Sequence, residues 1–162
     1  MKNVIIGLIM LTGIAFLPST SYAQSSTNPQ TADKIIGIVK AQWAAEIADP
    51  SNLVEQFKNY ADDYTEFNSD YSTRLDGKSV SMKLSEPSGK ASSRSVAAEM
   101  LNPKVQVYGD VAILSYNFAG ITRDKDGVMT PTRAKSTRVY VKQNGKWTFV
   151  HGNFAPDPLP KN

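Results

Sequence analysis

The sequence has no cysteine and a single histidine, His151, among its 162 residues. Without cysteine no disulfide can form and no thiolate can bind a metal, and one imidazole does not make a zinc site. Basic side chains exceed acidic ones only slightly, 18 to 15, and no basic run carries interleaved aromatic residues. The glycines show no phosphate-binding spacing. We therefore expect no metal, no cofactor and no nucleic-acid partner.

Long apolar runs are also missing, except for one from Val4 to Leu17. Lys2 precedes this run, Pro18 breaks it, and small residues follow at Ser21 and Ala23. This pattern is typical of a secretory signal peptide that is cleaved after Ala23. A membrane anchor is the alternative, but the run is shorter than the roughly 20 residues that a span needs. We expect a signal peptide at 1–23 and an exported protein, periplasmic or secreted, that has no membrane attachment after signal removal.

The rest of the chain has the length of one domain. We expect a flexible lead-in at 24–30, an α+β domain at 31–156 and a tail at 157–162. Thr31 is the expected N-cap of a first helix whose apolar residues recur at helical spacing: Ile35, Ile36, Val39, Trp43 and Ile47. A second helix after Asp49-Pro50, capped by Ser51 or Asn52, would carry Leu53, Phe57 and Tyr60 on one face.

Residues 69–95 are rich in serine and poor in apolar side chains, and they predict a loop with one short helical segment. Such a stretch is often a lid, a pocket rim or an interface, and equally often a solvated connection. From Ala97 onward the pattern predicts four strands with tight turns at Gly109-Asp110 and Asn144-Gly145. Together the elements predict a cone-shaped, curved antiparallel sheet covered by the N-terminal helices, with a pocket between sheet and helices.

Three segments carry a resemblance to a known family: "NPKVQVYGDVAILSY" (102–116), "TRVYVKQNGKW" (137–147) and "FVHGNF" (149–154). They resemble the nuclear transport factor 2-like superfamily, which includes SnoaL-like polyketide cyclases and ketosteroid isomerases. The likeness is greatest to the association domain of calcium/calmodulin-dependent kinase II, and it covers about Thr31 to Pro156. The resemblance implies the cone fold and a homodimer formed through the outer face of the sheet.

In the association domain, arginines line the pocket and attract carboxylate ligands. The arginine of the "TRV" motif is kept as Arg138, whereas two other basic positions fall at Phe118 and Phe154. The resemblance therefore implies a flatter, more apolar ligand with one acidic or carbonyl group held by Arg138. The alternative for Arg138 is an ion pair with a carboxylate from the first helix or from the dimer partner, such as Glu46 or Glu66.

His151 is the default candidate for a general base near neutral pH. Strict alternation along its strand places it on the same side as Trp147 and Phe149 and opposite Phe154. If Phe154 lines the pocket, His151 lies on the outer face, where the resemblance places the dimer contact. We expect it to have a structural or interface role.

The leading hypothesis is an exported small-molecule-binding or accessory domain without catalysis. Arg138 would anchor the ligand, and five aromatic residues would surround it: Tyr116, Phe118, Phe154, Tyr64 and Trp43. One alternative is a SnoaL-like or ketosteroid-isomerase-like isomerase, cyclase or dehydratase. In it Asp63 or Glu66 would abstract a proton, and Tyr64 or Arg138 would stabilise the oxyanion. A second alternative is a module whose role is oligomer assembly.

Overall fold

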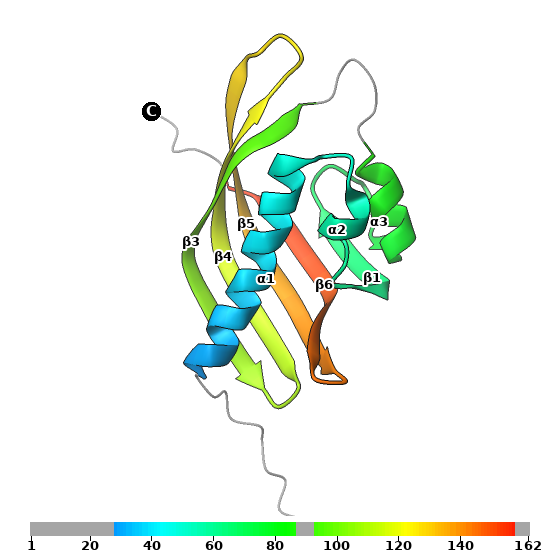
Figure 1. The fold of residues 1–162 in the computed structure, drawn as a ribbon, viewed down its shortest axis with the longest axis vertical. Coiled ribbons are helices and arrows are strands. Elements are labelled where there is room, and N and C mark those ends of the chain that lie inside the picture. Colours follow the sequence, from blue (N-terminus) through cyan, green and yellow to red (C-terminus); the bar gives the residue numbers. More distant parts are fainter. Residues whose placement is uncertain (1–27, 87–92, 158–162) are drawn as a thin grey trace, which may run out of the picture.

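The computed structural model describes residues 28–86 and 93–157 (Figure 1). The expected signal peptide at 1–23, most of the lead-in and residues 158–162 of the tail lie outside the described residues. Within the described part, no helix has both the length and the apolar character that a membrane crossing requires.

The structure is α+β, as predicted, with six strands in one open sheet of order β2-β1-β6-β5-β4-β3. The elements are α1 (Pro29–Ala48), α2 (Leu53–Gln56), β1 (Tyr60–Asn68), β2 (Leu75–Asp76), α3 (Lys78–Leu84), β3 (Arg94–Tyr108), β4 (Val111–Arg123), β5 (Met129–Gln143) and β6 (Lys146–Pro156). Figure 1 shows the long helix α1 lying across the concave side of the curved sheet. The sheet is mixed rather than purely antiparallel, because β1 pairs with β6 in parallel.

The first helix begins three residues earlier than the pattern predicts, at Pro29 with Asn28 as its N-cap. The side chain of Asn28 accepts a hydrogen bond from the backbone N–H of Thr31 at 3.2 Å. Pro29 takes the first helical position, where its missing N–H costs nothing. The expected cap at Thr31 is therefore wrong, and residues 29 and 30, expected in the lead-in, are helical. The buried stripe of α1 is nonetheless on the predicted face.

The second helix is a single turn that ends at Gln56. Its N-cap is Asn52, as predicted, whose side chain accepts from the Glu55 N–H at 3.2 Å. Tyr60, expected on this helix, is instead the first residue of β1. Its ring packs against Phe149 of β6 with 4.8 Å between centroids, and this long-range contact outweighs the local pattern.

The turns follow the sequence closely, but β6 contains a β-bulge that the sequence pattern did not reveal. Asn144 and Gly145 both have positive φ, 51° and 77°, as a type I′ turn requires. In β6, however, Phe149 pairs with Tyr140 and His151 with Val139, which leaves Val150 as an extra residue. The expected alternation along β6 is therefore wrong. The bulge lets both Phe149 and Phe154 face the concave side.

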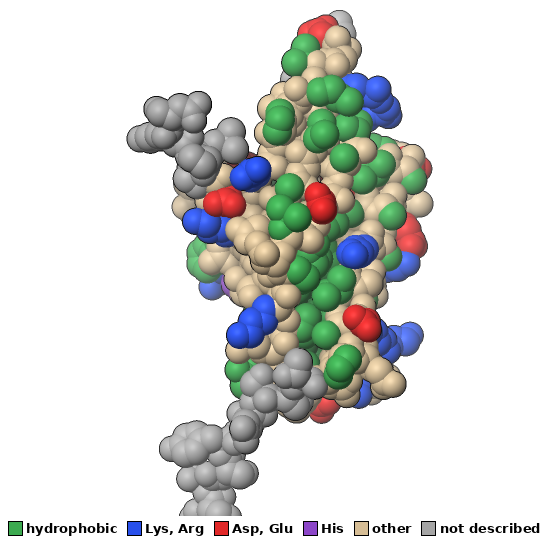
Figure 2. Space-filling model, turned by 90° about the vertical axis from the view of Figure 1, so that its left-hand side faces the viewer, with side chains coloured by type: hydrophobic (Ala, Val, Ile, Leu, Met, Phe, Trp, Pro, Cys, Tyr) green, Lys and Arg blue, Asp and Glu red, His purple; other side chains and the backbone are tan. Residues whose placement is uncertain are grey.

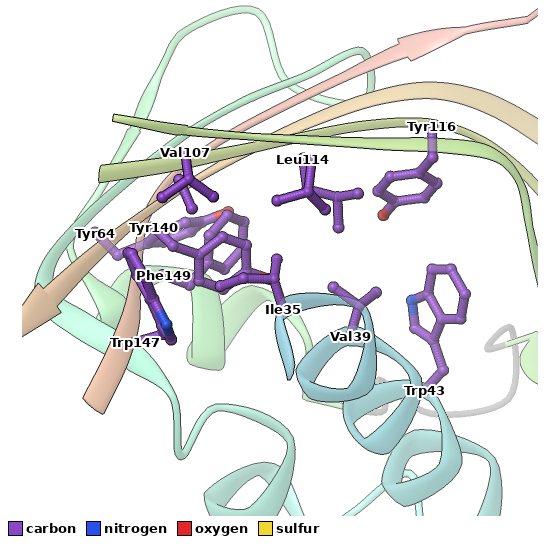
Figure 3. Packing of buried hydrophobic residues seen from close by; sticks show 12 residues of the cluster. Ile35, Val39, Trp43, Tyr64, Val107, Leu114, Tyr116, Tyr140, Trp147 and Phe149 are labelled. Atoms are coloured by element: carbon purple, nitrogen blue, oxygen red, sulfur yellow. The ribbon is translucent and has the colours of Figure 1, made fainter. Parts of the chain in front are cut away.

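The core lies between α1 and the sheet (Figure 3). From the helix, Ile35, Val39 and Trp43 point toward the strands, and the largest fully buried side chains include Tyr64 and Tyr140. Strand β2 forms one edge of the sheet, and β3 forms the other. Figure 2 shows this side of the molecule, where lysine and arginine side chains are scattered singly among apolar and acidic ones.

Candidate functional site: a cavity around a buried arginine

Two connected hollows lie between the sheet and the helices. The larger chamber has a volume of about 790 Å³ and extends toward α2, α3 and β1. The smaller chamber, of about 530 Å³, extends along β4 and β5. Both are within the usual size of small-molecule sites. They share six lining residues: Trp43, Glu46, Asn68, Asp70, Arg138 and Phe154.

Arg138 lies where the two chambers meet. Strand β5 directs it to the concave side, and only 4% of the residue is exposed. Its Nε donates to the Tyr116 hydroxyl at 2.9 Å, and its Nη1 donates to Gln42 Oε1 at 2.7 Å. The Gln42 amide nitrogen then donates to the Tyr60 hydroxyl at 2.9 Å. A chain of hydrogen bonds thus fixes the guanidinium from both the sheet and α1.

Two phenyl rings enclose the same guanidinium. Its central carbon lies 4.8 Å from the ring centroid of Phe149 and 5.2 Å from that of Phe154. Ring faces attract a cation, and more so when water is excluded. The β-bulge in β6 makes this double contact possible, because it brings both rings to one side of the strand.

The alternative for Arg138, an ion pair with Glu46 or Glu66, is not formed within the described part of the chain. Among the described residues, no carboxylate lies within 4.0 Å of a nitrogen of Arg138. Glu46 accepts from the Ser95 hydroxyl at 2.6 Å, and Glu66 accepts from Tyr64 and from Asn68, each at 2.9 Å. The partners that the guanidinium does have are neutral.

Four of the five predicted aromatic residues lie in the cavity wall. Trp43 and Phe154 line both chambers, whereas Tyr116 and Phe118 line the smaller one. The Trp43 ring meets Tyr116 and Phe118 edge to face, with centroid distances of 5.8 and 5.3 Å. These rings form an apolar surface beside the charged group.

The fifth aromatic residue, Tyr64, is not in the cavity wall. It is fully buried in the core, and its hydroxyl donates to Glu66 Oε2 at 2.9 Å. Asp63, on the same strand, is exposed and does not line the cavity. Glu66 does line the larger chamber. Of the four residues considered for catalysis, the structure therefore brings Glu66 and Arg138 to the cavity and leaves Asp63 and Tyr64 outside it. The Glu66 carboxylate already accepts two hydrogen bonds.

Three tyrosines surround this region: Tyr64 and Tyr140 are fully buried and Tyr60 is partly buried. Loss of water around each hydroxyl raises its pKa. For Tyr60 and Tyr140, burial outweighs the nearby charge of Arg138, which lowers the pKa. For Tyr64, burial and then the neighbouring Tyr60 and Glu66 raise the pKa. The tyrosines near Arg138 are thus strongly held in their neutral form.

The sequence pattern did not single out three residues of the cavity wall: Gln42, Tyr60 and Gln56. All three line the larger chamber. Gln42 follows Ile35 by seven residues, so it falls on the apolar stripe of α1, and a polar residue on such a stripe is a usable signal. Tyr60 had been expected on a helix, and Gln56 showed no pattern that could single it out.

His151 lies on the face of the sheet opposite Phe154, as expected. Its Nδ1 is 2.8 Å from the Thr65 hydroxyl, and its ring meets the exposed Phe67 edge to face. His151 lines neither chamber. In the part of the chain described, three or more potential metal ligands do not gather at any point.

Solved structures share this architecture. The association domain of C. elegans calcium/calmodulin-dependent kinase II has 18% identity and a TM-score of 0.63, over 78% of this chain and 96% of that one. A nuclear transport factor 2-like protein from Salmonella enterica has 15% identity and a TM-score of 0.67, over 83% and 96%. A Parabacteroides distasonis protein provisionally assigned as a ketosteroid isomerase has 18% identity and a TM-score of 0.61, over 78% and 87%. No curated protein matches the chain.

The curved open sheet, the covering helix and the cavity between them have the cone fold that is seen in solved nuclear transport factor 2-like proteins. The family model of the calcium/calmodulin-dependent protein kinase II association domain matches residues 55–158, which is more than half of the chain. The chain therefore belongs to this family. The resemblance noted in the sequence is confirmed for this family and for the fold.

Proposed function

We propose that this protein is a small-molecule-binding or accessory domain whose cavity holds a ligand with an apolar, flat body and one acidic or carbonyl group. The observation that carries this proposal is Arg138, a buried guanidinium with neutral partners at the junction of the two chambers. The proposal includes no catalytic step.

A buried cation needs compensation, because removing it from water is costly. A guanidinium has five N–H groups, and here Nε and one group on Nη1 are engaged. Arg138 also lines both chambers. A ligand carboxylate would supply the missing negative charge and could accept two parallel hydrogen bonds from one guanidinium.

The aromatic wall favours a flat ligand body over a small hydrophilic anion. Trp43 and Phe154 line both chambers beside Arg138, and Phe118 extends the apolar wall into the smaller chamber. Burial of an aromatic ring against such side chains supplies most of the binding free energy, while the arginine fixes orientation.

A thermal-shift screen with the purified mature chain tests the proposal. The compounds are benzoate, 3-phenylpropanoate, naphthoate and their uncharged primary alcohols. We expect at least one acid to raise the melting temperature of the wild type, and its alcohol to raise it much less. Arg138→Gln should abolish the shift given by the acid and leave the alcohol's effect unchanged.

The control variant is Arg133→Gln, which lies on the same strand and is exposed on the rim of the smaller chamber. It should leave the thermal shift largely intact. If an acid raises the melting temperature of Arg138→Gln as much as that of the wild type, Arg138 is not the anchor. The same follows if the alcohols raise the melting temperature of the wild type as much as the acids do. If Arg138→Gln unfolds, Arg138→Lys keeps the charge and serves as the second test, with bidentate recognition lost.

A homodimer through the outer face of the sheet is also part of the proposal. On this outer face, four paired residues form one row across four neighbouring strands, and each is half-buried in the single chain: Ile113, Val139, His151 and Thr65. Several structural relatives are hub domains, which fits an oligomer. Light scattering should give a dimer, and Val139→Asp should give monomers. A large defined particle would instead favour an assembly role.

Export remains a prediction from the N-terminal pattern. The test is the mass of the protein recovered from the native host, which should correspond to a chain beginning at Gln24. A full-length chain recovered from the cytoplasm would refute it.

A further inference from the structure

We propose that the ligand of the cavity is a zwitterion, an aromatic amino acid, whose carboxylate binds Arg138 and whose ammonium group binds the carboxylate of Glu46. This inference rests on the proposed function, because Arg138 holds the acidic group. It adds a second charged subsite and narrows the ligand class from acids to amino acids.

Glu46 brings an accessible carboxylate oxygen to the cavity. The residue is half-buried and lines both chambers. Its Oε1 accepts from the hydroxyl of Ser95 on β3 at 2.6 Å, and Ser95 lines the larger chamber too. In the described part of the chain, the buried side-chain polar atoms that lack a partner are the hydroxyl oxygens of Ser81 and Tyr140. Oε2 of Glu46 has no partner there either, so it retains accessible surface.

Glu46 also lies one helical turn after the residue that holds the guanidinium. Gln42 Oε1 accepts from Arg138 Nη1 at 2.7 Å. Positions four apart lie on the same face of a helix, with their Cβ atoms about 5–6 Å apart. Yet no oxygen of Glu46 is within 4.0 Å of a nitrogen of Arg138. Two opposite charges therefore line the same cavity without pairing, and a ligand with both charges on neighbouring carbon atoms can contact each of them.

The balance of charge in the larger chamber favours a ligand that also carries a positive group. Among the described residues, four carboxylates and two guanidiniums line this chamber: Glu46, Glu66, Asp70, Glu86, Arg94 and Arg138. A ligand with only a negative charge would enter against the excess of carboxylates. An ammonium group on the same ligand offsets this repulsion and makes a charge-assisted hydrogen bond to one of them.

The aromatic wall lies beside both charged subsites. Trp43 is the residue directly after Gln42 on α1, and it lines both chambers together with Phe154. Arg138 and Glu46 line both chambers as well. An amino acid bound by its two charged groups at Arg138 and Glu46 would therefore place an aromatic side chain against these rings.

The competing explanation is that Glu46 only joins α1 to β3 through Ser95. Replacement of Glu46 by glutamine separates the two roles, because the amide oxygen can still accept the Ser95 hydrogen bond while the negative charge is lost. Ser95→Ala makes the opposite change, since it removes the hydrogen bond and keeps the charge.

The experiment is isothermal titration of ligands that share one carbon skeleton. They are 3-phenylpropanoate, its 2-hydroxy derivative, and both enantiomers of its 2-amino derivative, phenylalanine. We expect one enantiomer of phenylalanine to bind the wild type about 10-fold more tightly than 3-phenylpropanoate, which is in the range of one charge-assisted hydrogen bond. The hydroxy acid should gain much less affinity.

Three variants assign this gain in affinity. Glu46→Gln should remove most of the gain of phenylalanine and leave the binding of 3-phenylpropanoate unchanged or slightly tighter. Ser95→Ala should retain the gain. Glu99→Gln is the matched control, because Glu99 is exposed on β3 and lines neither chamber, and it should retain the gain in full.

A gain that persists in Glu46→Gln, or that Ser95→Ala or Glu99→Gln loses to the same extent, would overturn the subsite. An equal gain for the hydroxy acid would overturn the assignment of an ammonium group. If Glu46→Gln does not fold, the wild type supplies the test: the gain should decrease as the salt concentration rises, and a constant gain would overturn the subsite.

The same titrations separate this inference from the proposed function. If phenylalanine shows no gain but Arg138→Gln abolishes the binding of 3-phenylpropanoate, the ammonium subsite is wrong and the proposed function stands. If the wild type binds neither the acid nor the amino acid, both fail.

Discussion

Gly152 provides a quantitative test of how the cavity wall is built. It lies on β6 directly opposite Arg138 and is buried. A Cβ added there would stand 2.6 Å from the hydroxyl of Tyr64 and 2.8 Å from Cε2 of Phe154. Real Cβ atoms essentially never approach so closely. Gly152→Ala therefore forces one or both rings to move.

Neighbouring residues restrict the movement of both rings. The hydroxyl of Tyr64 is held by Glu66, and the Phe154 ring lies against the guanidinium of Arg138. Overpacking of this kind costs about 1–3 kcal/mol in the free energy of unfolding. For a domain of this size the melting temperature should fall by roughly 4–12 °C. Differential scanning calorimetry measures both quantities.

Two further variants separate this mechanism from a general effect of alanine. At Gly37, exposed on α1, no atom lies within 4 Å of an added Cβ, so Gly37→Ala should stabilise by about 1 kcal/mol. Adding Tyr64→Phe to Gly152→Ala removes the nearest atom and should cost less than the sum of the two single changes. An unchanged melting temperature for Gly152→Ala, or strict additivity in the double variant, would refute the reasoning.

Two other predictions concern the tyrosines around Arg138. Tyr116→Phe removes the acceptor of Arg138 Nε and should destabilise by about 1–3 kcal/mol, as urea unfolding would show. Tyr140→Phe removes a buried hydroxyl that has no hydrogen-bond partner among the described residues, so it should cost much less. Equal losses would contradict the assignment of partners. The pKa values of Tyr60, Tyr64 and Tyr140 are raised from the ordinary value of 10.0 in the folded state. Their contribution to stability is therefore complete below pH 10, and it declines above that pH because the unfolded chain gives up protons that the folded chain retains. Absorbance at 295 nm should show these tyrosines ionising only together with unfolding, and their free titration in a folded protein would contradict the burial.

Local signals in the sequence predicted much of the fold. Gly109 and the Asn144-Gly145 pair marked turns whose positive φ angles the structure confirms, and Ile35, Val39 and Trp43 marked the buried face of α1. These features depend on neighbouring residues alone. The parallel pairing of β1 with β6 could not be predicted from local signals, because the two strands are separated along the sequence by more than half the length of the domain.

The site was predictable to the extent that it follows strand alternation. Arg138, Tyr116 and Phe118 lie on the predicted face, but the bulge at Val150 shifted the alternation of β6 by one residue. Tyr64 points into the core and not the cavity, because Phe149 and Tyr60 pack against its ring. Such contacts depend on the assembled sheet and leave no trace in the spacing of the residues.

The central claim is that Arg138 anchors an acidic ligand group inside the cavity. The most direct measurement is a crystal structure of the protein soaked with the acid that gives the largest thermal shift. We expect the carboxylate to lie within hydrogen-bonding distance of the Arg138 guanidinium and the ring to lie between Trp43 and Phe154. An acid bound elsewhere, or a cavity holding only water at saturating acid, would contradict it.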